Sequence, residues 1–140
     1  VWEHILLDGG AFTPLASLPG MRERVIKIGS AGKIFSLTGW KIGWMVAPPA
    51  LADVAARAHQ FLTFCSAPNL QAAVAFGLDE GDAWLAPMRD RFARARDRMT
   101  EGLRGIGYRV LDAQSTYFLV VDVAASDIGL GDEAFAKLAV

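Results

Sequence analysis

The segment from Ser30 to Trp44 gathers two lysines, three hydroxyl side chains and three glycines between short apolar runs. Within it, Lys33 follows the run 24–29 and precedes Ile34 and Phe35, which places it at the end of a predicted strand among apolar neighbours. Partial desolvation disfavours a charged ammonium, and the neutral amine is the form that attacks a carbonyl carbon. The segment therefore predicts a lysine nucleophile.

Two polar residues flank this lysine. Ser30 offers a hydroxyl three residues before Lys33, and Lys41 offers a flexible cation eight residues after it. A phosphorylated aldehyde suits this set, because its phosphate needs hydrogen-bond donors and positive charge while its carbonyl carbon meets the amine. The residues thus indicate an anionic carbonyl cofactor.

The pattern Ser-x-x-Lys-x-Phe-Ser-x-Thr-Gly-Trp-Lys-x-Gly-Trp resembles the cofactor-lysine region of class I and II aminotransferases, which have the type I fold of pyridoxal-phosphate (PLP) enzymes. It is most similar to the branch that holds kynurenine/glutamine transaminases and actinobacterial enzymes described as N-succinyldiaminopimelate aminotransferases. The similarity extends through residues 18–24, 71–75 and 116–119 and so covers nearly the whole chain.

The resemblance implies a role for each polar residue of the segment. Lys33 would hold pyridoxal 5'-phosphate as a Schiff base and would move a proton between the substrate α-carbon and the cofactor. Ser30 and Lys41 would bind the phosphate. Many relatives have arginine at the position of Lys41. The lysine ammonium, a point charge, therefore replaces a guanidinium that can make two parallel hydrogen bonds. The implied reaction moves an amino group between an amino acid and a 2-oxo acid, and the donors considered are kynurenine, glutamine, methionine, aspartate and succinyl-diaminopimelate.

One position departs from the family pattern. The family commonly has Asp-x-x-Tyr before the lysine region, with the aspartate paired to the pyridine nitrogen and the tyrosine donating to the cofactor's phenolic oxygen. The tyrosine position falls on Trp2, and the aspartate position falls before Val1. An indole N–H donates one hydrogen bond but neither accepts one nor ionises. Two hypotheses stay open: Trp2 contacts the cofactor in an altered site, or it only packs.

Composition and charge argue against several other classes of function. The net charge is −1, and the basic residues between 82 and 104 alternate with acidic ones, which is typical of a solvated helix face rather than of a nucleic-acid surface. His4, His59 and Cys65 lack the close spacing of a metal site, so no metal is predicted. Cys65 is expected to be a small buried residue, and a single cysteine fits a reducing cytoplasm.

No apolar run approaches the roughly 20 residues that a membrane span needs, and no targeting segment is visible. We therefore expect a cytoplasmic protein without a membrane or nucleic-acid partner. The chain opens without an initiator methionine and ends within an amphipathic pattern, so we also expect an internal piece of a longer protein, inactive by itself.

The distribution of apolar runs predicts an α/β fold. Short runs separated by glycine-rich loops and followed by helices fit a mainly parallel sheet covered by helices, with the cofactor at the strand ends. The longest expected helix carries apolar residues every three or four positions, from Leu85 to Ile106, which predicts a core-facing stripe; Pro87 either kinks this helix or marks its start. The expected strands are 1–7, 24–28, 43–47, 108–111 and 116–123, and the expected helices are 51–64, 70–78, 82–105 and a last one from Asp132.

The resemblance implies a domain organisation. Residues 1–81 would belong to the PLP-binding large domain, 82–105 would form the interdomain helix, and 106–140 would begin the α+β small domain. It also implies a homodimer in which the loop after 51–64 reaches the partner subunit's active site. Phe64 and Asn69 are candidates for that contact, and the alternatives are an aromatic core residue and a helix cap.

Three functions follow from these residues. The first is a transaminase. The second is another type I PLP enzyme, such as a C–S lyase or decarboxylase, because the bond to Lys33 does not by itself choose which α-carbon bond breaks. The third is a non-catalytic, aminotransferase-like regulatory domain.

Overall fold

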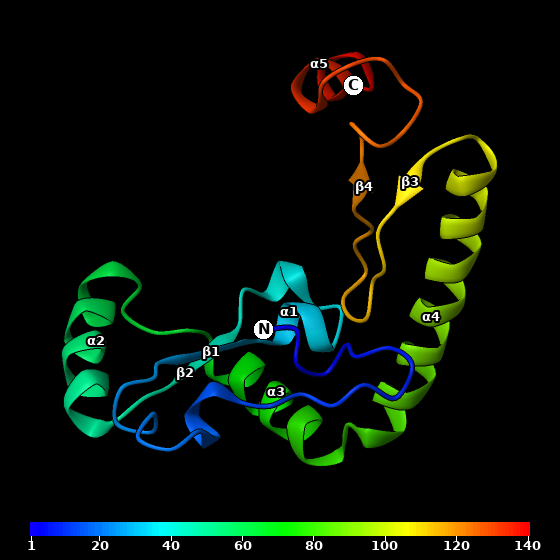
Figure 1. The fold of residues 1–140 in the computed structure, drawn as a ribbon. Coiled ribbons are helices and arrows are strands. Elements are labelled where there is room, and N and C mark those ends of the chain that lie inside the picture. The colour runs from blue at the N-terminus through cyan, green and yellow to red at the C-terminus, as the bar shows by residue number, and fades with distance from the viewer. The chain divides into compact units, whose positions relative to one another are not determined.

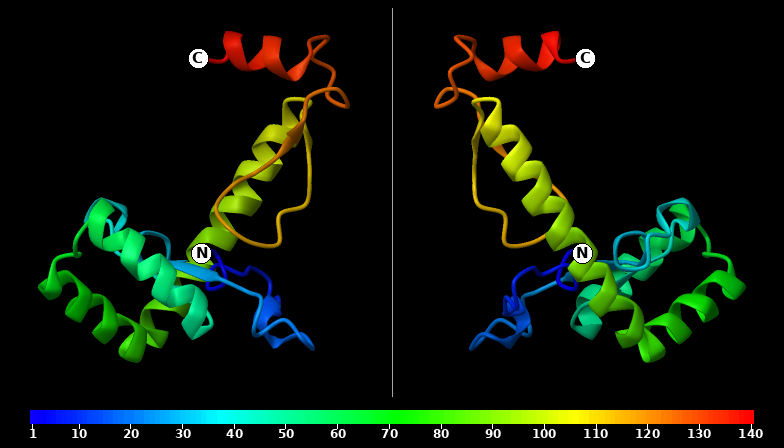
Figure 2. Two further views of the ribbon diagram at one scale, coloured as in Figure 1. Left: turned by 90° about the vertical axis from the view of Figure 1, so that its left-hand side faces the viewer. Right: turned by 90° about the vertical axis from the view of Figure 1, so that its right-hand side faces the viewer.

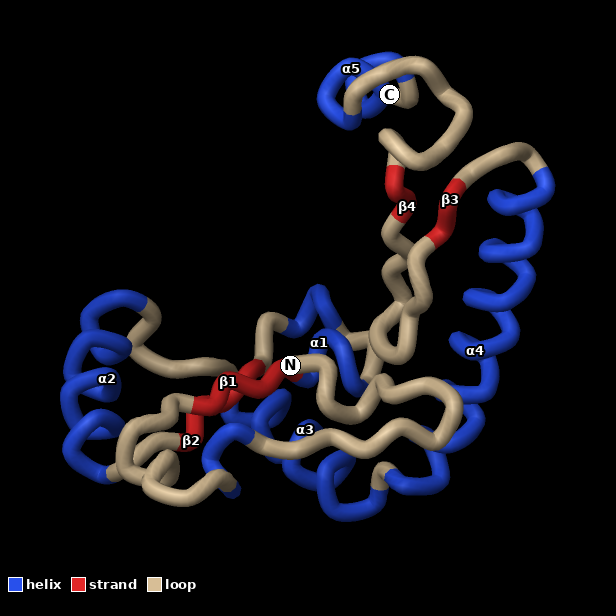
Figure 3. Tube along the Cα trace, in the orientation of Figure 1, coloured by secondary structure: helices blue, strands red, loops and turns tan.

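The computed structural model describes all residues from Val1 to Val140 and divides them into two compact units. Unit 1 comprises Val1–His4 and Ala11–Leu85, and unit 2 comprises Ile5–Gly10 and Ala86–Val140. Figures 1 and 2 show the ribbon from three directions, and Figure 3 marks its helices, strands and loops.

Unit 1 combines a two-stranded sheet, three short helical turns and two longer helices. Both longer helices begin on a proline, which suits the first helical position because its φ is preset and its missing N–H has no helical partner there. The helices expected at 51–64 and 70–78 are confirmed, each starting two residues earlier. The elements are η1 (Leu15–Ser17), β1 (Lys27–Ser30), α1 (Ala31–Ile34), η2 (Thr38–Trp40), β2 (Gly43–Val46), α2 (Pro49–Leu62) and α3 (Pro68–Glu80).

Strands β1 and β2 pair antiparallel, with Lys27 opposite Val46 and Ser30 opposite Gly43. A parallel arrangement is therefore wrong for this pair. The connection 31–42 holds only one α-helical turn and one 3₁₀ turn, whereas parallel neighbours are usually joined by a longer crossover helix. An otherwise parallel sheet often carries an antiparallel edge strand, so this pairing is compatible with the expected α/β fold. Strand β1 also begins three residues later than expected.

The core of unit 1 links the sheet to α3. Ala31, Ile42 and Val74 are buried together, and Phe35, Trp44 and Leu70 pack against them. Figure 1 shows α3 running alongside the strands and α1. The residues on either side of Lys33 therefore belong to the core, while the segment that carries it opens toward solvent at Ser36 and Thr38–Lys41.

The strand expected at 1–7 does not form. Residues 1–4 lie in unit 1 and belong to no strand, and in unit 2 Leu6 makes one isolated bridge to Ser115. Ile5 and Leu7 are nevertheless 0% and 2% exposed. The apolar run thus predicted burial correctly and pairing wrongly, because a strand requires a partner along its length.

Unit 2 contains most of α4 (Asp82–Gly105), then β3 (Arg109–Val110), β4 (Val121–Asp122) and α5 (Asp132–Leu138). Helix α4 spans the residues expected for the long helix, with Pro87 inside it rather than at its start. Strands β3 and β4 are antiparallel and far shorter than expected. Thr116 has φ of +67°, a left-handed conformation that interrupts the predicted strand at its first residue.

The apolar stripe of α4 is buried only at its beginning. Leu85 and Met88 are 7% and 1% exposed, but Met99 and Ile106 are 60% and 73% exposed, so the prediction of a continuous core stripe is wrong. Its exposed part lines a groove of about 1170 Å³ together with Tyr117 and other residues of 116–121. The assignment of 1–81, 82–105 and 106–140 to a large domain, an interdomain helix and a small domain stays a prediction.

None of the helices combines the length and apolar character that a membrane crossing needs.

Candidate active site

Lys33 lies in α1, a single helical turn that directly follows β1. Ser30 ends the strand and precedes the helix, with an extended backbone. The Ala31 N–H donates to the Ile42 carbonyl at 3.1 Å, so the two ends of the connection 31–42 meet. Because Lys41 directly precedes Ile42, the antiparallel pairing brings the backbone of Ser30 and Lys41 to the same end of the β1–β2 pair.

Lys41 ends η2 in the left-handed conformation, with φ of +55° and ψ of +36°. This conformation is uncommon for a residue with a side chain, and residues held in it cluster at functional sites. Lys41 is exposed and forms no ion pair with a carboxylate. Its cation is therefore available to an anionic ligand.

Gly32 brings two hydroxyl groups close to the backbone that carries Lys33. A Cβ at this position would lie 3.0 Å from Thr38 Cα, 3.3 Å from Ser30 Oγ and 3.4 Å from Thr38 Oγ1. Thr38 Oγ1 donates to the Gly32 carbonyl at 3.0 Å. The absence of a side chain at Gly32 thus leaves a small cradle between Ser30 and Thr38.

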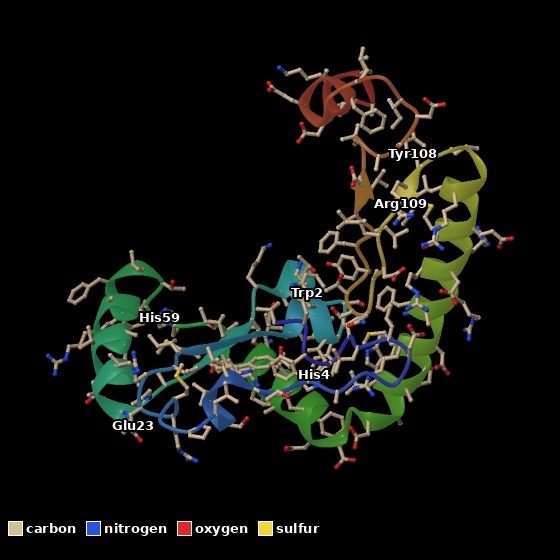
Figure 4. All side chains as sticks on the ribbon, in the orientation of Figure 1. Trp2, His4, Glu23, His59, Tyr108 and Arg109 are labelled. Atoms are coloured by element: carbon tan, nitrogen blue, oxygen red, sulfur yellow. The ribbon has the colours of Figure 1, made fainter.

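Trp2 and Lys33 are brought together in unit 1. The Lys33 Nζ atom lies 5.4 Å from the centroid of the Trp2 ring, within the range of a cation–π contact. Figure 4 shows the half-buried Trp2 side chain beside α1. The Trp2 ring face therefore contacts the amine that the sequence singles out as the nucleophile.

Glu3 ties the segment Val1–His4 to strand β1. Its side chain is 7% exposed and pairs with Lys27 Nζ at 3.1 Å. Burial raises the pKa of Glu3, whereas the Lys27 ammonium beside it lowers the pKa. Glu3 thus anchors the residue next to Trp2 as a carboxylate.

The Glu3 carboxylate makes a testable contribution to acid stability. Protonation of the Glu3 carboxylate removes its charge pairing with Lys27, so this stabilisation is present when Glu3 is ionised and is lost as the pH falls. Glu3→Gln should therefore flatten the pH dependence of the unfolding free energy at acidic pH, as measured by urea unfolding. Glu23→Gln, at an exposed carboxylate without an ion pair, is the control. Equal slopes for wild type and Glu3→Gln would refute this role.

The structure corrects three expectations about the region after α2. Phe64 is 76% exposed and so is not a core residue of this chain. Asn69 is not the cap of α3, because Ala67 occupies the N-cap position without a side-chain hydrogen bond. Cys65 is exposed rather than buried. No group of three or more His, Cys, Asp or Glu side chains is placed to hold a metal ion.

Trp84 contacts the Lys33 turn and was missed by sequence reasoning. Its Nε1 donates to the Ile34 carbonyl at 3.1 Å across 50 residues of sequence. No local pattern signals such a contact. Thr38 was also not assigned from the sequence. It lies inside the segment Ser30–Trp44, and its spacing from Gly32 was the sequence signal that could have pointed to it.

Comparisons with known proteins agree on one family. Residues 6–139 match the family described as aminotransferase class I and II. Over 122 residues the chain is 44% identical to the probable N-succinyldiaminopimelate aminotransferase DapC of Mycobacterium tuberculosis, covering 87% of this chain and 31% of that protein. Over 131 residues it is 34% identical to kynurenine–oxoglutarate transaminase 1 of Homo sapiens, covering 89% and 31%.

A solved structure of N-succinyldiaminopimelate aminotransferase from M. tuberculosis matches 99% of this chain and 36% of its own, with a TM-score of 0.91 and 41% identity. The α/β fold of the type I PLP enzymes is therefore the fold of this chain. The chain spans about a third of the length of the curated relatives it matches.

Proposed function

Because the chain belongs to the class I and II aminotransferase family, we propose that it carries the cofactor lysine of a PLP-dependent transaminase. The reaction moves an amino group between an amino acid and a 2-oxo acid. The observation that supports this most is the placement of Lys33, a half-buried amine on the first helical turn after β1, against the Trp2 ring and between Ser30 and Lys41 in the chain.

The residues around Lys33 fit a phosphorylated aldehyde. The segment offers one amine for the carbonyl carbon, the Ser30 hydroxyl as a hydrogen-bond donor, and the Lys41 cation, which has no ion-pair partner, for the phosphate charge. The cradle at Gly32 leaves room beside both hydroxyls, which a Cβ would reduce. Ser30 and Lys41 are accordingly the proposed phosphate ligands.

When bound, pyridoxal 5'-phosphate supplies an aldehyde carbon for an amine and a ring that withdraws electrons from the substrate α-carbon. Lys33 would hold the group at that aldehyde carbon through its Nζ atom. The Lys33 amine would also serve as the base that accepts the substrate α-proton and as the acid that returns it. Ser30 and Lys41 hold the phosphate, while Trp2 orients the Lys33 amine through its ring face.

Two alternatives use the same lysine. A C–S lyase or decarboxylase would break a different α-carbon bond, and a regulatory domain would bind the cofactor without turnover. The named relatives are both aminotransferases, which favours transamination. Their names also make succinyl-diaminopimelate and kynurenine the first amino donors to test, before glutamine, methionine and aspartate.

Product analysis separates the three functions. The protein in its full natural length, loaded with PLP and given an amino donor and 2-oxoglutarate, should form glutamate and the donor's 2-oxo acid in equal amounts. Release of CO₂ or of a thiol with ammonia would replace the transaminase with a decarboxylase or lyase. Cofactor binding without turnover of any donor would favour the regulatory domain.

Removal of the Lys41 charge should weaken cofactor binding. A hydrogen bond to a charged group contributes about 1.5–3 kcal/mol, so Lys41→Ala should raise the Kd for PLP roughly tenfold to hundredfold. Turnover at saturating cofactor should change less, because Lys41 does not bond to the reacting carbon. Equilibrium titration of absorbance measures the Kd, and Lys137→Ala in α5 is the matched control. An unchanged Kd would exclude Lys41 from the phosphate site.

We also propose that the protein is a cytoplasmic homodimer. The end of α2 and the loop after it expose Phe61, Leu62 and Phe64 at 89%, 85% and 76%. Clustered apolar side chains of this kind are typical of interaction surfaces, and a second copy of the chain is the partner that the family resemblance implies. The single exposed Cys65 fits a reducing compartment.

A further inference from the structure

Helix α1 is too short to be stable by its own hydrogen bonds. It contains only the four residues Ala31–Ile34, and it ends with a hydrogen bond from the Phe35 N–H to the Ala31 carbonyl at 3.0 Å. One turn fixes several backbone dihedrals for a single hydrogen bond, which is unfavourable in isolation. The position of Lys33 therefore depends on contacts from outside the turn.

Two side chains supply donors on either side of Lys33. Thr38 Oγ1 donates to the Gly32 carbonyl at 3.0 Å, and Trp84 Nε1 donates to the Ile34 carbonyl at 3.1 Å. The last carbonyls of a helix have no partner within it, and Gly32 and Ile34 are both buried. Each donor thus satisfies a carbonyl that would otherwise be costly to bury.

The Phe35 ring rests on two glycines that precede Trp84. A Cβ on Gly77 would lie 3.1 Å from Phe35 Cζ, and a Cβ on Gly81 would lie 3.2 Å from Phe35 Cε1. Both distances are shorter than ordinary van der Waals contact, so an added Cβ at either glycine would require the ring to shift by a few tenths of an ångström. Gly77, Gly81 and Trp84 are spaced by four and three residues along the end of α3 and the start of α4. We call these three residues the Lys33 seat.

We infer that Trp84 is a positioning residue for Lys33 and that the Lys33 seat holds the helical turn so that the amine meets its carbonyl partner. The seat acts through the backbone of Ile34 and the ring of Phe35 rather than by touching the cofactor. This inference rests on the proposed role of Lys33 as the cofactor lysine.

The test uses Trp84→Phe, which removes the Nε1 donor and keeps an aromatic ring. Without cofactor, amide hydrogen exchange in the peptide covering 31–36 should accelerate about fivefold or more, while exchange in α2 stays as in wild type. With PLP, the rate at which borohydride traps an adduct on Lys33 should fall by a similar factor. Both readouts are taken well below the unfolding midpoint of the variant.

Two glycine variants give a matched comparison. Gly77→Ala pushes on the Phe35 ring and should reproduce both effects, whereas Gly102→Ala, in α4 with nothing within 4 Å of its added Cβ, should behave as wild type. If Trp84→Phe fails to fold, Gly77→Ala and Gly102→Ala carry the same test. Unchanged exchange at 31–36 and an unchanged trapping rate would overturn the inference.

The test separates this inference from the proposed function. A wild-type protein that forms the Lys33 adduct, with a variant that forms it equally fast, rejects the seat and keeps the function. If the wild-type protein forms no adduct at Lys33, the proposed function is rejected. The role of Trp84 in positioning Lys33 for the reaction is then rejected too, whatever hydrogen exchange shows.

Discussion

Lys33→Ala should lower amino transfer by at least roughly 10²–10⁴-fold, the range expected when a single general acid–base group is lost. The variant lacks both the atom that bonds to the cofactor and the atom that moves the α-proton. The fold should survive, because the contact between Lys33 and Trp2 contributes only about 0.5–1 kcal/mol at a partly exposed site. Steady-state kinetics and the unfolding midpoint measure the two effects separately.

Lys33→Arg separates the positive charge at this position from the reactive amine. Its guanidinium can keep a cation over the Trp2 ring but does not provide a neutral amine at working pH. We expect it to retain wild-type stability and to be as inactive as the alanine variant. Amino transfer near the wild-type rate in either variant would contradict the assignment of Lys33.

Gly29→Ala should destabilise unit 1 by about 1–3 kcal/mol, the usual cost of overpacking a well-filled site. Gly29 lies in β1 opposite Trp44, and the Trp44 ring covers it. An added Cβ would lie only 2.1 Å from Trp44 Cε2 and 2.5 Å from Cζ2, so the ring would have to leave its place. Trp44 packs against the core of Ala31, Ile42 and Val74, and the disturbance should reach that core.

A second substitution should relieve this clash. Trp44→Leu alone loses packing, but in the Gly29→Ala background it also removes the overlap, so the two effects should not add. Chemical unfolding followed by far-UV circular dichroism gives the four free energies of the cycle. Gly39→Ala, whose Cβ would meet nothing within 4 Å, is the control. Additive free energies, or a stable Gly29→Ala variant, would show that Trp44 does not depend on the glycine.

The helices of this chain are largely predictable from its sequence. Pro49 and Pro68 mark the first positions of α2 and α3, and the charged, periodic residues of 82–105 mark α4. Local signals of this kind reside in neighbouring residues, so a single sequence displays them. The turn that carries Lys33 was likewise placed correctly at the end of a strand.

Strand pairing was less predictable, because it depends on partners elsewhere in the chain. The apolar run 1–7 looks like a strand but forms only one isolated bridge, from Leu6 to Ser115, and the antiparallel direction of β1 and β2 follows from the short turns between them. Thr116 has a left-handed conformation at the first residue of a strand that its composition favours. None of these features is carried by local composition.

The residues of the candidate site also fall into two groups: those that the sequence indicates and those that only tertiary packing brings in. Ser30, Lys33 and Lys41 were found because they lie in one segment, and Trp2 because the family pattern has a ring at that position. Trp84 reaches Ile34 from 50 residues away, and Glu3 meets Lys27 across 24 residues. Such contacts are set by tertiary packing, and only the fold reveals them.

The assignment of Lys33 as the cofactor lysine is tested by borohydride reduction of the PLP-loaded protein in its full natural length, followed by mass mapping of the modified peptide. Among the four lysines Lys27, Lys33, Lys41 and Lys137, we expect the reduced adduct on Lys33 alone. A folded protein that gives no adduct on Lys33, or an adduct on another lysine instead, would contradict this assignment.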